Sequence, residues 1–419
     1  MKWYPYLIIA GWSLLSNVVP AAETDIHHNN FSGHHIYVNA NDKLNKVIHY
    51  VQLKDGSLLE AGRIPTRGSG TGGYKPLTMS ASAADALVSA SAITMSADHQ
   101  WLFVVNAGDN SISSFSVDDS GGLHFVDRKN TQSSGIPSTL SYNDEKSVLY
   151  VGHTFGPDHI RTFSVADGVL ALKAGAQSVN TDSMHDRVLT QIQISPDHHY
   201  LLANVLYDKR PEKINGKFTL FPANKTTKNG LAVFPVLEDG SPGKPRFYDA
   251  DGETPFGLTF IQGGGGRFVN TLDQAPGIVV LGKLNGDGTI TNLSRAEARV
   301  NVPGKDAIGS CWVSMSPDGK VAFVAGFDTG EVASFTVKSD TLTYAKGGQG
   351  KLEKGDLSND PKAVATGSPV GNWVSSNGYF YQLYPSAAKL VAFKIDNDSL
   401  HRIESYPIPL NSPQGITGF

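Results

Sequence analysis

The chain has a single cysteine, Cys311, among its 419 residues. No internal disulfide can therefore form, and the stability of the fold has to come from packing. Cys311 stands next to Trp312, and we expect it to be a small, buried core residue, because free cysteine is among the most buried residue types.

A strong charge of either sign is also missing. With 35 basic and 39 acidic residues, the formal net charge is -4, and no long run of lysine and arginine occurs. Such a chain creates no long-range field that would attract a phosphate backbone. We therefore expect no nucleic-acid partner.

The one long apolar run lies at the N-terminus. Lys2 precedes an apolar stretch from Trp3 to Leu15, and small residues follow in Val19–Ala22. This order is typical of a cleaved export signal, and the stretch is short and interrupted for a membrane anchor. We predict a signal peptide over residues 1–22, a flexible segment over 23–34 and a secreted or periplasmic protein without a membrane span. An uncleaved anchor is the alternative.

Helical periodicity is absent, and a strand pattern takes its place. The stretches Ile93–Asp118 and Val313–Val337 have the same sequence pattern. In both, alternating apolar and polar residues are followed by a turn, then by an apolar run, and then by a second group of small polar residues. Period-two alternation with regular turns predicts strands joined by hairpins.

Two independent marks of this unit each occur seven times. The first is an apolar second strand, found at His35–Val38, Trp101–Val104, Val148–Val151, Tyr200–Ala203, Arg267–Val269, Val321–Val324 and Tyr379–Gln382. The second is a turn rich in Asp, Gly and Ser, found at Lys54–Leu58, Asp119–Leu123, Ala166–Leu170, Glu238–Ser241, Gly286–Ile290, Lys338–Leu342 and Asn397–Leu400. The marks interleave with a period of roughly fifty to sixty residues, which predicts an all-β, seven-bladed propeller over residues 35–419. A six-bladed ring with one degenerate repeat and two stacked sandwiches are the alternatives.

The two ends of the chain predict how the ring closes. The first copy begins at its second strand, and the tail Ser412–Phe419 resembles the predicted innermost strands Pro137–Ser141 and Pro255–Phe260. We expect the C-terminal strand to complete the first blade, which removes an open edge. The connection over residues 62–90 has no strand pattern, and we interpret its glycines as turns.

The repeated unit, Ser-Pro-Asp-Gly followed by an apolar strand and Phe-x-Val, resembles the lactonase-like seven-bladed propellers, which include phosphogluconolactonases and carboxymuconate cyclases. The resemblance covers residues 35–419. It implies a site at the channel mouth where His, Arg and Glu perform acid–base chemistry on a lactone. In this sequence the matching places hold Thr190–Gln191, Phe256–Gly257, Thr271 and Ala325–Gly326 instead.

Loops that converge on one face of such a ring are its default binding site. The longest of them covers residues 205–217 in the fourth blade. Its Arg210 can hold a carboxylate through two hydrogen bonds, while His153 and His185, from loops close by, can act as bases near neutral pH. We assign these three residues as candidate catalytic groups. A solvated insertion and ordinary loop hydrogen bonds are the alternatives.

Seven further residues are candidate ligand contacts, since they lie on loops or inner strands at the expected channel mouth: Tyr207, Asp208, Gln191, Asp273, Trp312, Asp328 and Trp373. If the side chains of Asp273 and Asp328 both point into the channel, they can replace the glutamate that the resemblance implies and this sequence lacks. A turn-forming role is the alternative. The two tryptophans can stack on sugar rings; core packing is the alternative.

We therefore expect an exported lactonase-like propeller that recognises a small anionic or sugar-like ligand on its loop face, with lactone hydrolysis or cycloisomerisation by a non-standard site. The alternative is a non-enzymatic binding or scaffold propeller for a protein or a cell-envelope partner. We expect a monomer and assign no cofactor and no metal site. The pairs His27–His28 and His34–His35 are assigned to the flexible segment.

Overall fold

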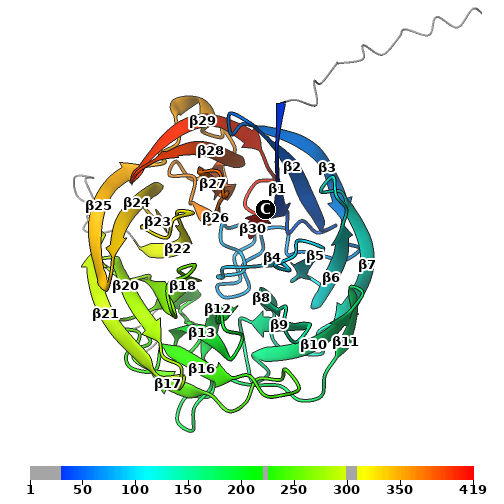
Figure 1. Cartoon of the computed structure of the whole chain (residues 1–419), viewed down its shortest axis with the longest axis vertical. Coiled ribbons are helices and arrows are strands. Elements are labelled where there is room, and N and C mark those ends of the chain that lie inside the picture. Colours follow the sequence, from blue (N-terminus) through cyan, green and yellow to red (C-terminus); the bar gives the residue numbers. More distant parts are fainter. Residues whose placement is uncertain (1–29, 220–224, 299–308) are drawn as a thin grey trace, which may run out of the picture.

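Seven four-stranded antiparallel sheets stand radially around a central channel (Figure 1). The computed structural model describes residues 30–219, 225–298 and 309–419. The predicted seven-bladed propeller is confirmed, and neither six blades nor two sandwiches fits these sheets. The predicted export signal, residues 1–22, and residues 23–29, which include His27–His28, lie outside the described residues.

Each blade contributes four strands that follow one another from the channel to the rim. Blade one contains β30 (Ile416–Gly418), β1 (Phe31–Asn39), β2 (Lys46–Leu53) and β3 (Leu58–Pro65). Blade two contains β4 (Ile93–Met95), β5 (Trp101–Asn106), β6 (Ser111–Val117) and β7 (Leu123–Asn130). Blade three contains β8 (Pro137–Asn143), β9 (Val148–His153), β10 (Ile160–Ala166) and β11 (Val169–Leu172).

Blade four contains β12 (Val188–Ile194), β13 (Tyr200–Tyr207), β16 (Leu231–Pro235) and β17 (Arg246–Tyr248), and its long loop forms the hairpin β14 (Glu212–Ile214) and β15 (Lys217–Thr219). Blade five contains β18 (Pro255–Phe260), β19 (Arg267–Leu272), β20 (Ile278–Leu284) and β21 (Ile290–Glu297). Blade six contains β22 (Ser310–Met315), β23 (Val321–Gly326), β24 (Glu331–Lys338) and β25 (Thr341–Gln349). Blade seven contains β26 (Val370–Val374), β27 (Tyr379–Tyr384), β28 (Lys389–Asp396) and β29 (Ser399–Pro407).

Burial explains why the second strand carries the strongest sequence mark. All seven predicted apolar runs form second strands, and all seven Asp/Gly/Ser turns join a third strand to a fourth. A second strand is covered on both faces by neighbouring blades, so β5 is buried along almost its whole length. A fourth strand lies at the rim, and β3 is mostly exposed after its first residue. A continuous apolar run is thus the expected pattern only near the channel.

The C-terminal strand closes the ring, as predicted. β30 pairs with β1 in antiparallel register, with Tyr37 opposite Thr417. The amide of His35 donates to the carbonyl of Phe419 at 3.0 Å, and the amide of Phe419 donates back at 3.1 Å. The first strand itself begins at Phe31, four residues before the predicted start of the propeller at residue 35.

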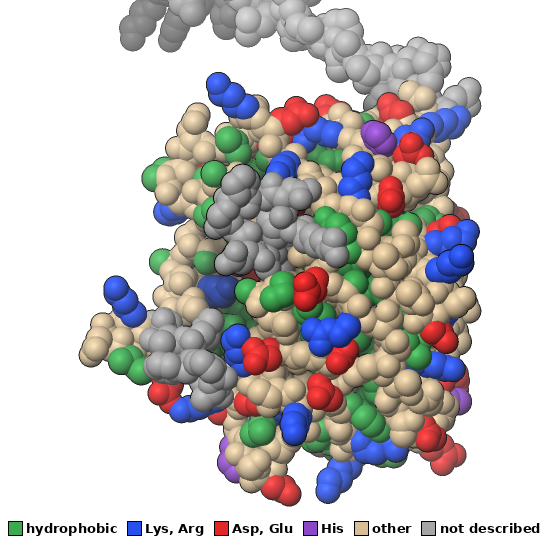
Figure 2. Space-filling view, turned by 90° about the vertical axis from the view of Figure 1, so that its left-hand side faces the viewer, with side chains coloured by type: hydrophobic (Ala, Val, Ile, Leu, Met, Phe, Trp, Pro, Cys, Tyr) green, Lys and Arg blue, Asp and Glu red, His purple; other side chains and the backbone are tan. Residues whose placement is uncertain are grey.

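The side of the ring over β21 and β25 carries basic and acidic side chains intermixed, without a patch of one sign (Figure 2). Within the described ranges, the helices include none that is both long and apolar enough to cross a membrane.

Deleting residues 412–419 should lower the free energy of unfolding by about 4–6 kcal/mol, since it removes the buried side chain of Ile416 and the three hydrogen bonds of the Gln414 amide. Urea denaturation followed by fluorescence measures this loss. A synthetic peptide of residues 410–419 should restore part of the stability in trans. An unchanged unfolding midpoint in the deletion variant would show that β30 does not close the ring.

Candidate functional site

The connection between β3 and β4 enters the channel on the loop face. It is the light-blue coil at the centre of the ring in Figure 1, and its residues Leu77, Leu87 and Val88 are buried. The strand boundaries place it at residues 66–92, close to the predicted 62–90, but it is more than a set of turns. We call residues 85–91 the plug.

Hydrogen bonds fasten the plug to the innermost strands of three blades. The Ser89 hydroxyl donates to the carbonyl of Ser138 on β8 at 2.7 Å. The Ala90 amide donates to the carbonyl of Thr190 on β12 at 3.2 Å, and the indole of Trp312 on β22 donates to the Ser89 carbonyl at 3.0 Å. The plug therefore bridges the channel rather than resting on it.

The Gln414 side chain joins the plug to the closing segment of the chain. Its oxygen accepts from the amide of Leu87 at 2.8 Å, and its nitrogen donates to Asp85 Oδ1 at 2.6 Å and to the Ser89 carbonyl at 2.9 Å. Asp85 also faces Lys75 at 3.6 Å. Burial raises the pKa of Asp85 to about 6, and the Lys75 ammonium opposes that shift.

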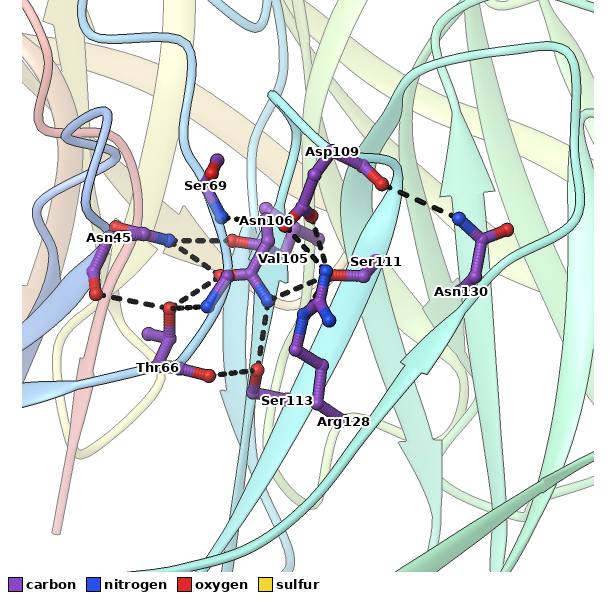
Figure 3. A network of polar contacts seen from close by, with 11 residues as sticks. Asn45, Thr66, Ser69, Val105, Asn106, Asp109, Ser111, Ser113, Arg128 and Asn130 are labelled. Carbon is purple, nitrogen blue, oxygen red and sulfur yellow. Dashed lines mark hydrogen bonds and ion pairs between the residues drawn. The ribbon is translucent and has the colours of Figure 1, made fainter.

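A polar network between blades one and two holds residues 66–69, where the connection that leads to the plug begins (Figure 3). The buried amide of Asn106 donates to Ser113 Oγ at 2.8 Å and to Ser111 Oγ at 3.2 Å, and its oxygen accepts from Thr66 Oγ1 at 2.7 Å. Asp109 accepts from the backbone amide of Ser69 at 2.9 Å. Because the network holds residues 66–69 against blade two, the segment that follows is directed toward the channel.

Residues without ionisable side chains occupy the places that match the family's acid–base set. Thr190, Phe256, Thr271 and Ala325 are all buried. The Thr190 hydroxyl donates to the carbonyl of Phe256 at 2.9 Å, and the Thr271 hydroxyl accepts from the amide of Gly257 at 2.9 Å. These side chains tie inner strands together and offer no group that could move a proton near neutral pH.

A pocket of 420 Å³ opens on the loop face beside the connection between β3 and β4. Its walls come from residues 75–84 on one side and from blades six and seven on the other, and they include Lys75, Asp328 and Lys362. Asp328 and Lys362 are exposed. The pocket thus combines two ammonium groups with a carboxylate.

The two candidate aspartates of blades five and six lie close together. Both carboxylates lie near the backbone of Gly309: a Cβ atom placed there would be 2.5 Å from Asp273 Oδ1 and 3.8 Å from Asp328 Oδ2. Burial raises the pKa of Asp273 to about 6, and the negative charges of Asp328 and Asp85 add to the shift.

Tyr207 and Cys311 lie next to this acidic pair. Burial raises the pKa of the Tyr207 hydroxyl well above its usual value, and the charge of Asp273 raises it further. Cys311 is buried and free, which confirms the prediction of a small core residue. Burial also raises the pKa of its thiol, so Cys311 stays protonated.

The structure sets His153 apart from any open surface. Its side chain is fully buried, with Nε2 2.9 Å from Thr131 Oγ1 and Nδ1 3.2 Å from the carbonyl of His159. Burial lowers the pKa of His153 to about 3 and that of His159 to about 4. Neutral rings in this setting hold loops together and have no path to a ligand.

The cationic loop of blade four is engaged in local contacts. Arg210 Nε lies 2.6 Å from Asp186 Oδ1, and its guanidinium lies 4.2 Å from the centre of the Phe155 ring. Asp208 forms an ion pair at 3.0 Å with the fully buried Arg187. His185 is exposed. None of these side chains lines the loop-face pocket.

The remaining predicted contacts lie deeper in the channel. Gln191, Trp312 and Trp373 line a cavity of about 190 Å³ beneath the plug. The Gln191 amide donates to the carbonyl of Leu258 at 2.9 Å and to Ser91 Oγ at 3.1 Å, so it joins blades four and five to the plug. Across the part of the chain that the structure describes, no three His, Cys, Asp or Glu side chains are grouped as metal ligands.

Sequence reasoning missed Lys75, Asp85 and Lys362. All three lie in irregular connections, where periodicity carries no information. For Lys75 and Asp85 the available signal was the length of the segment between β3 and β4, because long structureless connections inside a compact fold are usually functional.

Comparisons with known proteins agree with this architecture. The family model described as "Lactonase, 7-bladed beta-propeller" matches residues 27–185. A putative 6-phosphogluconolactonase from Bacteroides fragilis has a TM-score of 0.64 at 16% identity, over 93% of this chain and 98% of that one. The periplasmic gluconolactonase of Pseudomonas aeruginosa has a TM-score of 0.63 at 19% identity, over 92% and 98%.

A protein from Lactobacillus plantarum has a TM-score of 0.64 at 13% identity, over 92% of this chain and 99% of that one. No curated protein matches the sequence. The predicted resemblance to lactonase-like seven-bladed propellers is confirmed at the level of the fold.

Replacing Gln414 by Leu should loosen the plug. Three hydrogen bonds are lost, so amide hydrogen exchange over residues 85–91 should become about tenfold faster or more. The matched control is Gln349→Leu, which also removes three hydrogen bonds, to Ser334, Asp398 and Leu400, but in blades six and seven. Equal exchange of residues 85–91 in both variants would show that Gln414 does not hold the plug.

Acid should destabilise the protein through its buried histidines. Their folded-state pKa values lie below the unfolded value of 6.5, so the unfolded chain takes up protons first, and stability is lost as the pH falls from 6.5 toward about 4. Each histidine should cost about 1–2 kcal/mol between pH 7 and pH 5. Urea denaturation at both pH values measures the loss, which should be smaller in His153→Gln. An equal loss in this variant would exclude His153 as a contributor.

Proposed function

We propose that the protein binds a small sugar acid or its lactone in the loop-face pocket and hydrolyses the lactone with Asp273 and Asp328. The observation that carries the proposal is the convergence of these two carboxylates beside a pocket that contains Lys75 and Lys362. The two neighbours named as gluconolactonases support the class of substrate, because they share the fold.

The pocket suits an anionic, hydroxyl-rich ligand. Its volume of 420 Å³ falls in the range of about 300–1,000 Å³ that is common for small-molecule sites. The ammonium groups of Lys75 and Lys362 attract a carboxylate, while Thr78, Ser80 and Ser82 offer hydroxyls for the ligand's own hydroxyl groups.

The carboxylate pair supplies the acid–base chemistry. Ionised Asp273 takes a proton from a water molecule that Asp328 orients by accepting its other hydrogen. The water oxygen then attacks the lactone carbonyl carbon, and a lysine ammonium stabilises the oxyanion that forms. When the oxyanion collapses, the bond between this carbon and the ring oxygen breaks. The ring oxygen receives a proton from the carboxyl group, which leaves a hydroxy acid and a regenerated Asp273. The reverse course on the same pair is the condensation of the hydroxy acid to its lactone, with release of water.

Other parts of the proposal come from sequence. Export by residues 1–22 to the periplasm or the medium agrees with the periplasmic neighbour, and we propose a monomer. His185 and Arg210 are proposed to act at a distance, by drawing an anionic ligand toward the loop face, which should affect KM more than kcat.

A second candidate function is binding without turnover, to a protein or a cell-envelope polymer. It is favoured by Thr190, Phe256, Thr271 and Ala325, which occupy the family's catalytic places without an ionisable group. The plug, which fills the channel mouth on the same face, also favours it.

Base-consumption titration with glucono-, galactono- and muconate-derived lactones tests the proposal. Asp273→Asn and Asp328→Asn should each lower kcat by about 100-fold or more, since general acid–base catalysis contributes about 10²–10⁴-fold. In the wild type, kcat/KM should fall about tenfold per pH unit below pH 6, because Asp273 must be ionised.

Asp119→Asn is the matched control, because Asp119 is exposed in a rim turn of blade two and should leave turnover unchanged. Calorimetric binding of gluconate separates the two candidate functions. Turnover that both Asp variants retain would refute the assigned chemistry, and saturable binding without any turnover would favour the second candidate.

A further inference from the structure

The channel has a second opening, on the face opposite the loops. A pocket of 770 Å³ lies there, lined by the turns that join first to second strands and by aromatic residues that include Phe260, Trp373 and Phe419. Thr259 and Trp373 line both this pocket and the 190 Å³ cavity beneath the plug. The two spaces therefore adjoin, and the plug closes the inner one toward the loop face.

The lining of both spaces is polar but almost without charge. Among the described residues that form these walls, no Asp, Glu, Lys or Arg occurs, and the ionisable side chains are His34 and His99. Such a site has no Asp or Glu to pair with a cationic ligand and no Lys or Arg to pair with an anionic one. The loop-face pocket, by contrast, contains two lysines.

Inner strands of different blades present hydrogen-bonding groups to the inner cavity. Thr94, Thr259 and Thr417 line this cavity, and none of their three hydroxyls donates or accepts a hydrogen bond within the described residues. Gln193 Oε1 is buried there without a hydrogen-bond partner in the same part of the chain. A buried amide oxygen without a partner is costly, and a rotation of the Gln193 side chain that turns this oxygen toward the cavity would let a ligand hydroxyl satisfy it.

The outer pocket has a preorganised aromatic platform. Trp373 stacks on Tyr381, with ring centres 6.0 Å apart and an angle of 22°. Tyr381 is fully buried, and its hydroxyl donates to the Gly56 carbonyl at 3.0 Å. Directly after the closing strand, Phe419 stacks on His99, with ring centres 4.7 Å apart. Rings held in this way lose little conformational entropy when a flat ligand stacks on them.

From these features we propose a second binding site, on the face opposite the loops, for an uncharged saccharide. One sugar ring stacks on Trp373, and hydroxyl groups of the terminal residue reach Gln193 and the threonines of the inner cavity. Hydroxyls both donate and accept, which matches the mixed amide and hydroxyl groups of this wall. The inner cavity, about 190 Å³, has room for about six water molecules, which a terminal sugar would displace.

Isothermal titration with maltotriose, cellotriose and chitotriose tests the site, with trigalacturonate as a charged comparison. At least one neutral trisaccharide should bind saturably, and trigalacturonate should bind at least about tenfold more weakly because no cation faces it. Gln193→Met should raise Kd about tenfold by removing hydrogen bonds at constant size. Trp373→Ala should raise Kd by a similar factor or more.

Thr259→Val is a further, nearly isosteric variant that should fold normally and weaken binding, and Thr336→Val on the exposed rim of β24 is its control. Asp273→Asn should leave saccharide binding unchanged, which separates this site from the loop-face pocket. Absence of saturable binding for all three trisaccharides would overturn the proposal. So would binding that neither Gln193→Met nor Trp373→Ala weakens.

Discussion

The side-chain amide of Gln414 holds together the two features on which the rest of the molecule depends. It lies just before the strand that closes the ring, and it bonds to the plug through Leu87, Asp85 and Ser89. Closure and plugging are therefore coupled: the strand cannot leave blade one without breaking the bonds that hold the plug. A buried amide with all three bonds satisfied specifies one arrangement, since any partial opening leaves polar groups unpaired in the interior.

The plug divides the channel into two environments with different chemistry. On the loop face, carboxylates from blades five and six and from the plug itself lie near Lys75. Burial raises the pKa values of Asp85 and Asp273 to about 6, and the charges of Asp328 and Asp85 add to the shift of Asp273. Below the plug, the inner strands present hydroxyl and amide groups, and charge is almost absent from the walls that the structure describes. The charged side suits the chemistry of acids and lactones, whereas the neutral side suits only neutral, hydrogen-bonding ligands.

The places that match the acid–base set implied by the resemblance to lactonase-like propellers hold packing residues in this chain. Thr190 and Thr271 use their hydroxyls to bond neighbouring inner strands, and Phe256 packs edge-on against Trp312 at 4.7 Å. Such contacts stabilise the ring below the plug. Acid–base groups are found instead on the loops above, where Asp273 and Asp328 meet.

The sequence by itself determined the number of blades, their strand order and the closure by the C-terminal strand, because period-two patterning and turn chemistry are local properties that repeat. It also singled out Asp273, Asp328, Trp312 and Trp373, since their positions at strand ends and on inner strands follow from the repeat. Only the tertiary structure decided that His153 is buried, that Arg210 pairs with Asp186, and that residues 85–91 fill the channel. These outcomes depend on contacts between residues far apart in the chain, which no local pattern records.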